Sequence, residues 1–263
     1  LKTAVLIGGA SMGMQMQRLR YNPHIIVATP GRLLDHIEHK TVNLSFTRVL
    51  VLDEADRMFD MGFAPQINRI LAAVSKDRQT MLFSATMPNA IMNLASRHMK
   101  LQIRFEIAPS GTAAEGVTHE LFVVKKEAKV RLLESTLGQY HGSVLTFVRR
   151  KHDAKRIVRA VRAMNHGAAE LHSGRSLAQR REALEGFKSG KYRVLVATDI
   201  AARGIDVKGI ELVLNFDLPD NPEDYVHRIG RTGRAGHEGH AISFANPDQA
   251  REVREIERLI RLA

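Results

Sequence analysis

The chain has 263 residues, and its 39 Lys and Arg exceed its 28 Asp and Glu, which gives a formal net charge of +11. Hydrophobic residues make up 44% and charged residues 25%, which is typical of a folded globular protein and excludes a disordered one. Cysteine is absent, which excludes disulfides, thiolate metal sites and cysteine nucleophiles.

The length predicts about two domains, and the basic excess predicts a polyanionic partner. No apolar segment approaches the roughly 20 residues that span a bilayer, and no signal peptide is recognisable. Together with the lack of cysteine, this predicts a cytoplasmic protein. The chain begins at Leu1, directly before an apolar segment, so we expect the natural start to lie further upstream.

Short apolar segments alternate with segments of helical period, which is typical of parallel strands joined by crossover helices. In the first part of the chain, strands are predicted over residues 4–7, 25–28, 49–52, 80–83 and 102–107. In the second part, they are predicted over residues 120–124, 144–148, 193–197, 211–215 and 241–245.

Apolar residues within 67–74 and within 253–260 recur with the spacing of amphipathic helices that cover a sheet. Thr29 followed by Pro30 predicts the N-cap and first residue of a helix. Residues 108–118 carry Pro, Gly and Ser with neither apolar period, and they are the predicted linker.

An apolar segment at residues 48–52 ends in Asp53, Glu54 and Asp56. Acidic groups after a strand of a parallel sheet face its ligand crevice. Because Mg²⁺ prefers oxygen ligands, Asp53 is suited to hold a nucleotide-bound Mg²⁺ and Glu54 to orient an attacking water. A solvated acidic turn is the alternative. A calcium loop is disfavoured, because these residues and Asp60 lack the alternate spacing that such a loop requires.

Three arginines and two glycines occur together in the segment HRIGRTGR, residues 227–234. Guanidinium groups bind phosphate oxygens in a forked geometry, and glycines let the backbone approach closely. The segment is therefore suited to stabilise a transferring phosphoryl group. The alternative is a basic surface turn that contacts nothing, or that contacts only a nucleic-acid backbone.

Several motifs follow one another in a fixed order along nearly the whole chain. They are Gly8-Gly9, TPGR at 29–32, DEAD at 53–56, SAT at 84–86, LTFV at 145–148, ATDIAARGID at 197–206 and HRIGRTGR at 227–234. In this order they resemble the motifs of DEAD-box ATP-dependent RNA helicases. The segment at 175–199 is similar to bacterial members of that family.

The resemblance implies an α/β fold with two RecA-like parallel-sheet domains of the P-loop NTPase class, the first of them incomplete. The domains would cover residues 1–107 and 119–263, joined by the linker at 108–118. ATP with Mg²⁺ would bind in the cleft between the domains. A single strand or short duplex of RNA would lie across both, held through its backbone.

The resemblance also implies roles for individual residues. The catalytic residues would be Asp53, Glu54, Arg231 and Arg234, with Asp53 holding Mg²⁺ through water. Residues that couple hydrolysis to strand separation would be Asp56, Ser84, Thr86 and His227. The second domain would bind the nucleotide through Gly204 and Asp206. RNA would be bound by Gly9, Thr29, Gly31, Arg32, Arg149, Gly174, Thr198 and Asp199.

Physical chemistry supports these RNA contacts. A helix that begins at Pro30 directs free backbone N–H groups and a positive dipole end toward an anion. Contacts to phosphate and sugar carry little sequence preference and weaken with salt. With no Trp, 4 Tyr and 10 Phe, the chain offers few aromatic rings on which bases could stack.

The chain departs from the family in one important respect: no phosphate-binding loop ending in Gly-Lys-Ser/Thr precedes the acidic motif. Gly8 and Gly13 have the required separation, but Met14 and Gln15 follow where Lys and Ser or Thr are needed. The chain therefore resembles a helicase that lacks its front portion, and we expect it to hydrolyse ATP poorly or not at all. Leu177 stands where the family often has Gln.

Two other functions remain as alternatives. One is an RNA-binding or annealing module that works without hydrolysis, and the other is an unrelated nucleotide-binding enzyme of α/β class. The paired histidines His36 with His39 and His237 with His240 are interpreted as solvated or capping residues rather than metal ligands. A first domain without its first strand is expected to expose a sheet edge and to aggregate.

Overall fold

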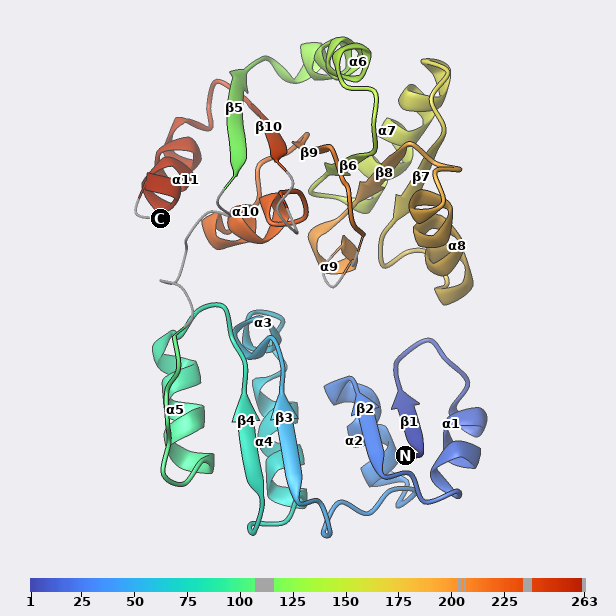
Figure 1. The fold of residues 1–263 in the computed structure, drawn as a ribbon, viewed down its shortest axis with the longest axis vertical. Coiled ribbons are helices and arrows are strands. Elements are labelled where there is room, and N and C mark those ends of the chain that lie inside the picture. Colours follow the sequence, from blue (N-terminus) through green and yellow to red (C-terminus); the bar gives the residue numbers. More distant parts are fainter. Residues whose placement is uncertain (107–115, 203–204, 206, 234–237, 262–263) are drawn as a thin grey trace. The chain divides into compact units, whose positions relative to one another are not determined.

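The computed structural model describes residues 1–106, 116–202, 205, 207–233 and 238–261. The chain divides into two compact units, Leu1–Ser110 and Gly111–Ala263, which are treated separately below (Figure 1). Within these described ranges, no helix combines the length and the apolar character needed to span a membrane.

The first unit alternates strands and helices. Its elements are β1 (Thr3–Leu6), α1 (Met12–Leu19), β2 (Ile25–Ala28), α2 (Pro30–Glu38), β3 (Val49–Leu52), α3 (Ala55–Asp60), α4 (Ala64–Ala73), β4 (Gln79–Leu82) and α5 (Asn89–His98). The strands form two parallel pairs, β1 with β2 and β3 with β4, and the two pairs are not hydrogen-bonded to each other. Helices α2 and α4 pack together, and Leu34 and Ile70 share one apolar cluster between them.

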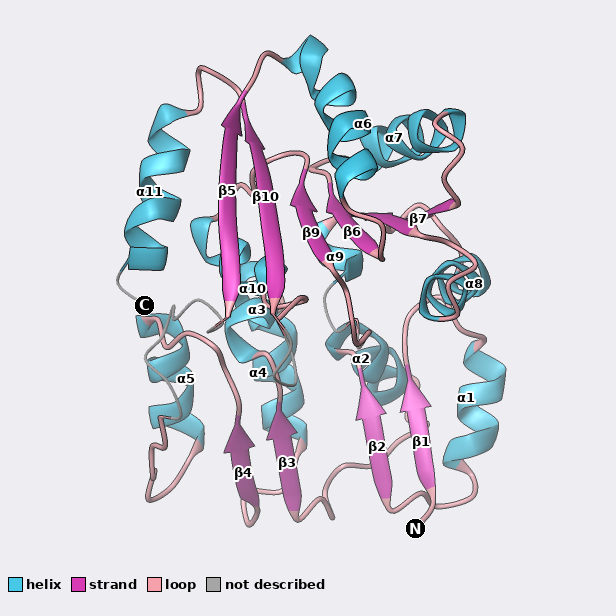
Figure 2. Ribbon diagram, turned by 45° about the horizontal axis from the view of Figure 1, so that its top comes forward, coloured by secondary structure: helices cyan, strands magenta, loops and turns pink. Residues whose placement is uncertain are grey.

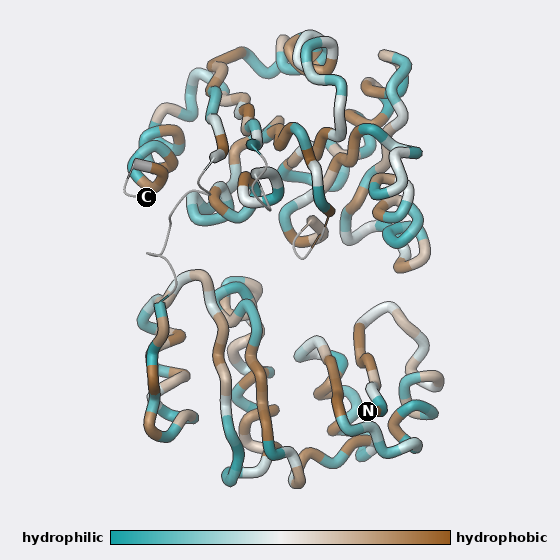
Figure 3. The backbone as a smooth tube through the Cα atoms, in the orientation of Figure 1, coloured by the Kyte–Doolittle hydropathy of each residue, from teal (hydrophilic) through white to brown (hydrophobic). Residues whose placement is uncertain are grey.

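One face of these strand pairs is left uncovered within the first unit. Val27 on β2 is 54% exposed and Val51 on β3 is 49% exposed. Their neighbours Ile26 and Leu52 point the other way and pack in the apolar clusters under the helices. Figure 3 shows the tube of β2 and β3 as hydrophobic. A parallel sheet is normally covered on both faces, so this surface is unusually apolar.

The strand predicted at 102–107 is wrong for its described part, because residues 102–106 form no strand, and residue 107 lies outside the description. Ile103 is 76% exposed and Phe105 is 86% exposed. An apolar sequence becomes a strand only where a neighbouring strand pairs with its backbone N–H and C=O groups. None of the strand pairings formed by the described residues includes this segment.

The second unit contains one six-stranded parallel sheet with the order β5-β10-β9-β6-β8-β7 (Figure 2). Its strands are β5 (Val117–Val123), β6 (Val144–Phe147), β7 (Ala168–Leu171), β8 (Val194–Ala197), β9 (Leu212–Asn215) and β10 (Gly239–Ala245). Its helices are η1 (Lys126–Ala128), α6 (Lys129–Gln139), α7 (Lys151–Ala163), α8 (Leu177–Lys188), α9 (Asp199–Ala202), α10 (Pro222–Ile229) and α11 (Ala250–Arg261).

Both faces of this sheet are buried at its central strands β9, β6 and β8, whereas the edge strand β5 is largely exposed. Val144 and Val194 pack on one face in the cluster that includes Ile157 of α7. Leu145 and Leu195, the next residue of each strand, pack on the other face in a second cluster. Because side chains alternate along a strand, a continuous apolar segment supplies both clusters.

Most predicted elements of the second unit agree with the structure to within a few residues. The sequence missed β7, because its residues AAEL include two alanines and a glutamate, which are depleted in strands. β5 begins at Val117, so the last two residues of the predicted linker belong to a strand, while 108–115 lie outside the described residues.

Candidate functional site

The acidic motif and the SAT motif meet at the carboxyl ends of two paired strands. Asp53 and Asp56 follow β3, and Ser84 and Thr86 follow β4. The two strands are parallel, with Leu52 in register with Leu82, so their carboxyl ends lie at the same edge. In open α/β sheets this edge is where ligands bind.

Hydrogen bonds connect the two motifs directly. The backbone N–H of Thr86 donates to Asp56 Oδ2 at 2.8 Å, and the Thr86 hydroxyl donates to the same oxygen at 2.9 Å. The Asp56 N–H donates to Ser84 Oγ at 3.1 Å, and the Ser84 hydroxyl donates to the Thr86 carbonyl at 2.7 Å. The two motifs are therefore directly connected.

The Asp56 carboxyl group is ionised more readily than an ordinary aspartate. Burial alone would raise its pKa, but the hydrogen bonds from Thr86, the Arg57 amide and Ser84 outweigh it and lower the pKa overall. The charged carboxylate is the form that accepts these bonds. Asp56 thus acts as a fixed acceptor that holds the loop after β4.

Asp53 and Glu54 remain exposed beside this network. Glu54 adopts a left-handed backbone conformation with a φ of 50°, and its carboxylate pairs with Arg57 at 3.0 Å. Asp53 Oδ1 accepts the Glu54 N–H at 3.0 Å. A single exposed carboxylate fits Mg²⁺, which keeps several waters and binds through one or two carboxylates plus substrate phosphates.

No group of three or more metal-ligating side chains gathers anywhere in the described part of the chain. His36 is fully buried and contacts Thr41 Oγ1 at 2.8 Å and Gln15 Oε1 at 3.1 Å. His39 contacts the Asp35 carbonyl. His39 is thus the capping residue that the sequence interpretation expected, whereas His36 is buried and hydrogen-bonded rather than solvated or capping. His237 lies outside the described residues.

A second strand-end cluster in the first unit brings together the Gly-Gly and TPGR motifs. β1 and β2 are paired in parallel, so Gly9 and Thr29 lie at the same edge. The Arg32 guanidinium donates to the Ala10 carbonyl at 2.9 Å and pairs with Asp35 at 3.3 Å. These contacts attach the loop after β1 to the start of α2.

The backbone of this cluster is open to a ligand. Gly9 has a φ of 77°, a conformation that favours glycine. A Cβ placed on Gly9 or on Gly31 would have no other atom within 4 Å. The predicted start of α2 at Pro30 is confirmed, although the Thr29 side chain makes no capping hydrogen bond. The free N–H groups at the start of α2 therefore have no side-chain acceptor at the N-cap.

In the second unit, the predicted RNA-binding residues also lie at one edge. Arg149 follows β6, Gly174 follows β7 and Thr198 follows β8, three neighbouring parallel strands. Arg149 pairs with Asp220 at 3.0 Å and donates to the Leu218 carbonyl at 3.2 Å. The sequence placed these residues far apart, and the sheet order brings them together.

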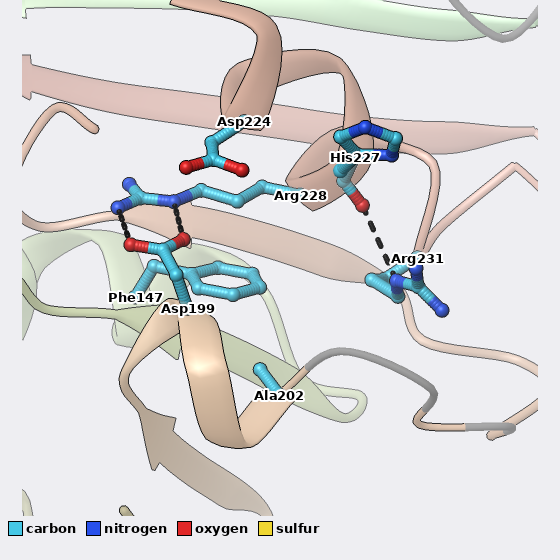
Figure 4. A pocket seen from close by; sticks show the side chains of 7 residues that line it. All are labelled: Phe147, Asp199, Ala202, Asp224, His227, Arg228 and Arg231. Atoms are coloured by element: carbon cyan, nitrogen blue, oxygen red, sulfur yellow. Dashed lines mark hydrogen bonds and ion pairs between the residues drawn. The ribbon is translucent and has the colours of Figure 1, made fainter. Parts of the chain in front are cut away.

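Arg228 is a residue whose role the sequence interpretation missed. Its side chain is 2% exposed, and it binds both carboxylate oxygens of Asp199, at 2.5 and 2.7 Å (Figure 4). It also donates to Asn215 Oδ1 at 3.0 Å and to the Asp217 carbonyl at 2.7 Å. The guanidinium carbon lies 4.9 Å from the centre of the Phe147 ring. One buried cation therefore connects the ends of β6 and β9 and the segment after β8 with α10.

This contact also bears on Asp199. Arg228 binds both carboxylate oxygens of Asp199, which fixes the orientation of that side chain. The only sequence signal for the pair was that both residues fall within recognisable motifs, and their pairing depends on the tertiary fold.

His227, Arg228 and Arg231 line a small pocket together with Asp199 (Figure 4). Arg231 donates to the carbonyls of His227 and Ile205, both at 3.2 Å. The cavity has a volume of about 10 Å³, far below the roughly 300 Å³ of a typical ligand site, so it is too small to enclose a nucleotide by itself. The other predicted nucleotide residues, Gly204, Asp206 and Arg234, lie outside the described residues.

Two family models match the chain. The model described as DEAD/DEAH box helicase matches residues 1–94, and the model described as helicase conserved C-terminal domain matches residues 126–236. The matches cover the strand-end clusters described above.

Individual relatives agree with this assignment. The ATP-dependent RNA helicase DbpA of Escherichia coli (strain K12) is 42% identical over 262 residues, which cover 99% of this chain and 57% of DbpA. The ATP-dependent RNA helicase RhlB of Pseudomonas aeruginosa (strain UCBPP-PA14) is 42% identical over 264 residues, 99% of this chain and 66% of RhlB. The chain thus spans somewhat more than half the length of these curated relatives.

Solved structures show the same similarity. S. cerevisiae Dbp5 bound to RNA and ADP BeF3 matches with a TM-score of 0.87 and 28% identity, covering 98% of this chain and 68% of Dbp5. A DEAD box protein from the hyperthermophile Methanococcus jannaschii is 39% identical, with a TM-score of 0.53, and covers all of this chain and 71% of that protein. The parallel α/β sheets described above are RecA-like, and the chain belongs to the DEAD-box family of RNA helicases.

Proposed function

We propose that the chain is part of an ATP-dependent RNA helicase that couples ATP hydrolysis to RNA binding and local duplex separation. One observation carries the proposal. Asp53 and Glu54 are exposed beside Asp56, which is bonded to the loop that contains Ser84 and Thr86. A change at the acidic motif is thereby transmitted to a neighbouring loop, as coupled hydrolysis requires.

In this proposal, residues of both units act on one nucleotide. ATP with Mg²⁺ supplies the transferable phosphoryl group, and the metal neutralises the charge that develops on it. Asp53 holds the metal through water, and Glu54 orients the attacking water. Arg231 and Arg234 stabilise the phosphoryl charge, Gly204 and Asp206 contact the nucleotide, and His227 couples the units.

RNA is proposed to bind at the strand-end edges of both units. Its contacts in the first unit are Gly9, Thr29, Gly31 and Arg32. Its contacts in the second unit are Arg149, Gly174, Thr198 and Asp199. Backbone N–H groups and guanidinium groups bind phosphate without reading bases, so little sequence preference is expected.

The 263-residue chain by itself is proposed to be a poor ATPase, because no Gly-Lys-Ser/Thr loop precedes the acidic motif. The structure gives Gln15 another role, since it is 3% exposed, donates to the Ile7 carbonyl at 3.0 Å and contacts His36. RNA-stimulated phosphate release from the purified chain is the direct measurement. Release well above the background without protein would overturn this part of the proposal.

The role of Arg231 is tested in a longer version of the protein that carries a phosphate-binding loop. We expect Arg231→Ala to lower the rate of ATP hydrolysis about a hundredfold or more, because an arginine finger contributes roughly 10³ to 10⁵ in rate. RNA affinity should stay nearly unchanged. Turnover within twofold of the parent would contradict the assignment.

The second candidate is an RNA-binding or annealing module that works without hydrolysis. The lack of a Gly-Lys-Ser/Thr loop within the 263 residues favours it for the chain by itself. The two candidates differ in one measurement. An annealing module accelerates the pairing of complementary RNA strands equally with and without ATP, whereas a helicase requires ATP to separate them.

A further inference from the structure

Helix α7 carries a row of basic residues that the helicase motifs do not include. Lys151, Lys155, Arg159 and Arg162 recur at intervals of three or four residues, which places them along one side of the helix. All four are exposed, while Ile157 on another side of the helix is fully buried in the core. We name these four residues the α7 basic row.

Three members of the α7 basic row, Lys151, Lys155 and Arg159, have no acidic partner among the described residues, whereas Arg162 interacts electrostatically with Glu182. Asp153 is the one acidic residue of α7, and it pairs with Arg156 at 3.3 Å. Across the described part of the protein, the side chains of Lys151, Lys155 and Arg159 form no ion pair or hydrogen bond.

Such an arrangement destabilises the isolated helix. Like charges four residues apart repel each other, and Lys151, at the first helical position, also faces the positive end of the helix dipole. Helix α11 of the same unit is different, because its arginines are interleaved with glutamates and Arg251 pairs with Glu255 at 2.9 Å. The excess is therefore specific to α7, and an anionic ligand would relieve its repulsion.

The α7 basic row begins near the carboxyl ends of β6, β7 and β8, where the predicted RNA-binding residues of the second unit lie. Helix α7 follows β6 and packs against β7 and β8 (Figure 1). A Cβ placed on Gly174 would lie 3.6 Å from Lys151 Cδ, so the stem of Lys151 lies against the loop that is proposed to hold RNA. From there the row continues along the helix.

We propose that Lys151, Lys155 and Arg159 bind the backbone of RNA that extends beyond the strand-end site, and so lengthen the RNA-binding surface of the second unit along α7. The inference rests on the proposed RNA binding. A spacing of four residues corresponds to about 6 Å along the helix, which suits the repeat of a sugar-phosphate backbone.

RNA fits the row better than a lipid surface does. A helix that lies on a membrane inserts an apolar face between the lipids. The large apolar residues of α7, including Ile157 and Val161, are instead buried against the sheet of the second unit.

The test uses the whole 263-residue chain and fluorescence anisotropy with two labelled RNAs. One is a short oligonucleotide that only spans the strand-end site, and the other carries the same segment with a single-stranded extension at each end. The variant combines Lys155→Gln with Arg159→Gln. The matched control combines Arg254→Gln with Arg258→Gln, which removes the same charge from exposed positions of α11.

For the extended RNA, the α7 variant is expected to bind about tenfold more weakly. Its slope of log affinity against log salt should fall by about 1.4, since each phosphate contact on a single strand contributes about 0.7. The short RNA should bind the variant and the parent equally, and the α11 control should match the parent with both RNAs.

Equal loss for both RNAs, no loss for either, or an equal loss in the α11 control would each overturn the inference. So would a variant that binds both RNAs normally while losing affinity for vesicles of anionic lipid. If the parent itself binds neither RNA, the proposed RNA binding fails as well. A parent that binds neither RNA is distinguishable from the outcomes that overturn only the α7 inference, because each of those outcomes is observed with a parent protein that binds RNA.

Discussion

Arg228 is a buried charged residue that connects several segments of the second unit. Its guanidinium is buried and makes hydrogen bonds to Asp199, Asn215 and the Asp217 carbonyl. A buried ion pair adds little net stability compared with apolar residues, because desolvation offsets the attraction. Removing one partner is costly, however, because the other charge stays buried without compensation.

Arg228→Ala is therefore expected to lower the free energy of unfolding of the second unit by about 3 to 5 kcal/mol. Arg228→Lys should be intermediate, because an ammonium keeps the charge but cannot bind both Asp199 oxygens in a forked geometry. Urea denaturation followed by circular dichroism measures both variants. The control is Arg251→Ala, which removes an exposed ion pair and should change little. An Arg228→Ala variant as stable as the parent would refute this role.

Asp56 gives the first unit a defined pH dependence. Its pKa is lowered in the folded state, so it contributes stability above its unfolded pKa of about 3.9 and loses that contribution as the pH falls through the folded value. Asp56→Asn removes this titration. The variant should be less stable than the parent at neutral pH, and the difference should shrink below about pH 4.

Urea unfolding of the parent and of Asp56→Asn at several pH values measures that difference. Other carboxylates titrate in both proteins and cancel in the comparison. A difference that stays constant between about pH 6 and about pH 2 would show that Asp56 has an ordinary pKa.

At the scale of elements, the strands of the two units differ in how they are joined into sheets and in how much of their apolar surface is buried. The strands of the second unit lie in one continuous sheet, and alternate side chains of its central strands β6, β8 and β9 enter two apolar clusters, while the edge strand β5 is largely exposed. In the first unit, Val27 of β2 and Val51 of β3 are about half exposed, and their strand pairs are not joined. An apolar sheet face next to unpaired strand edges favours self-association.

Replacing Val27 and Val51 together by Thr is expected to lower the aggregated fraction of the chain by roughly half, since Thr keeps the strand preference but reduces the apolar surface. Light scattering after size-exclusion chromatography measures this fraction. The matched control replaces Met14 and Met92, which are exposed on helices, by Thr. If the control lowers aggregation as much as the strand variant does, the sheet face is not responsible.

At the scale of the whole molecule, the net charge of +11 makes RNA binding strongly dependent on salt. We expect RNA affinity to fall about tenfold or more between about 50 and about 200 mM salt, because each phosphate contact releases counterions. Homopolymers of different bases should bind within about threefold of one another, since the predicted contacts avoid the bases. Binding that resists salt or strongly prefers one base would contradict backbone recognition.

Local chemistry made much of the protein predictable from its sequence. Uninterrupted apolar segments predicted β6, β8 and β9 of the second unit, because a strand buried on both faces needs such a sequence. Thr29 and Pro30 predicted the start of α2, because the N-cap and the first helical residue are adjacent in the sequence. The order of the motifs predicted the family, since each motif combines residue types suited to phosphate or metal chemistry.

Only the tertiary structure decided the remaining features, because they depend on neighbours that are distant in the chain. Residues 102–106 are apolar enough for a strand but have no partner strand, whereas the weak segment of β7 is held by β8. Likewise, neither the burial of Arg228 against Asp199 nor the lowered pKa of Asp56 has a sequence pattern of its own. Sequence alone shows which side chains are available, and packing determines which of them meet.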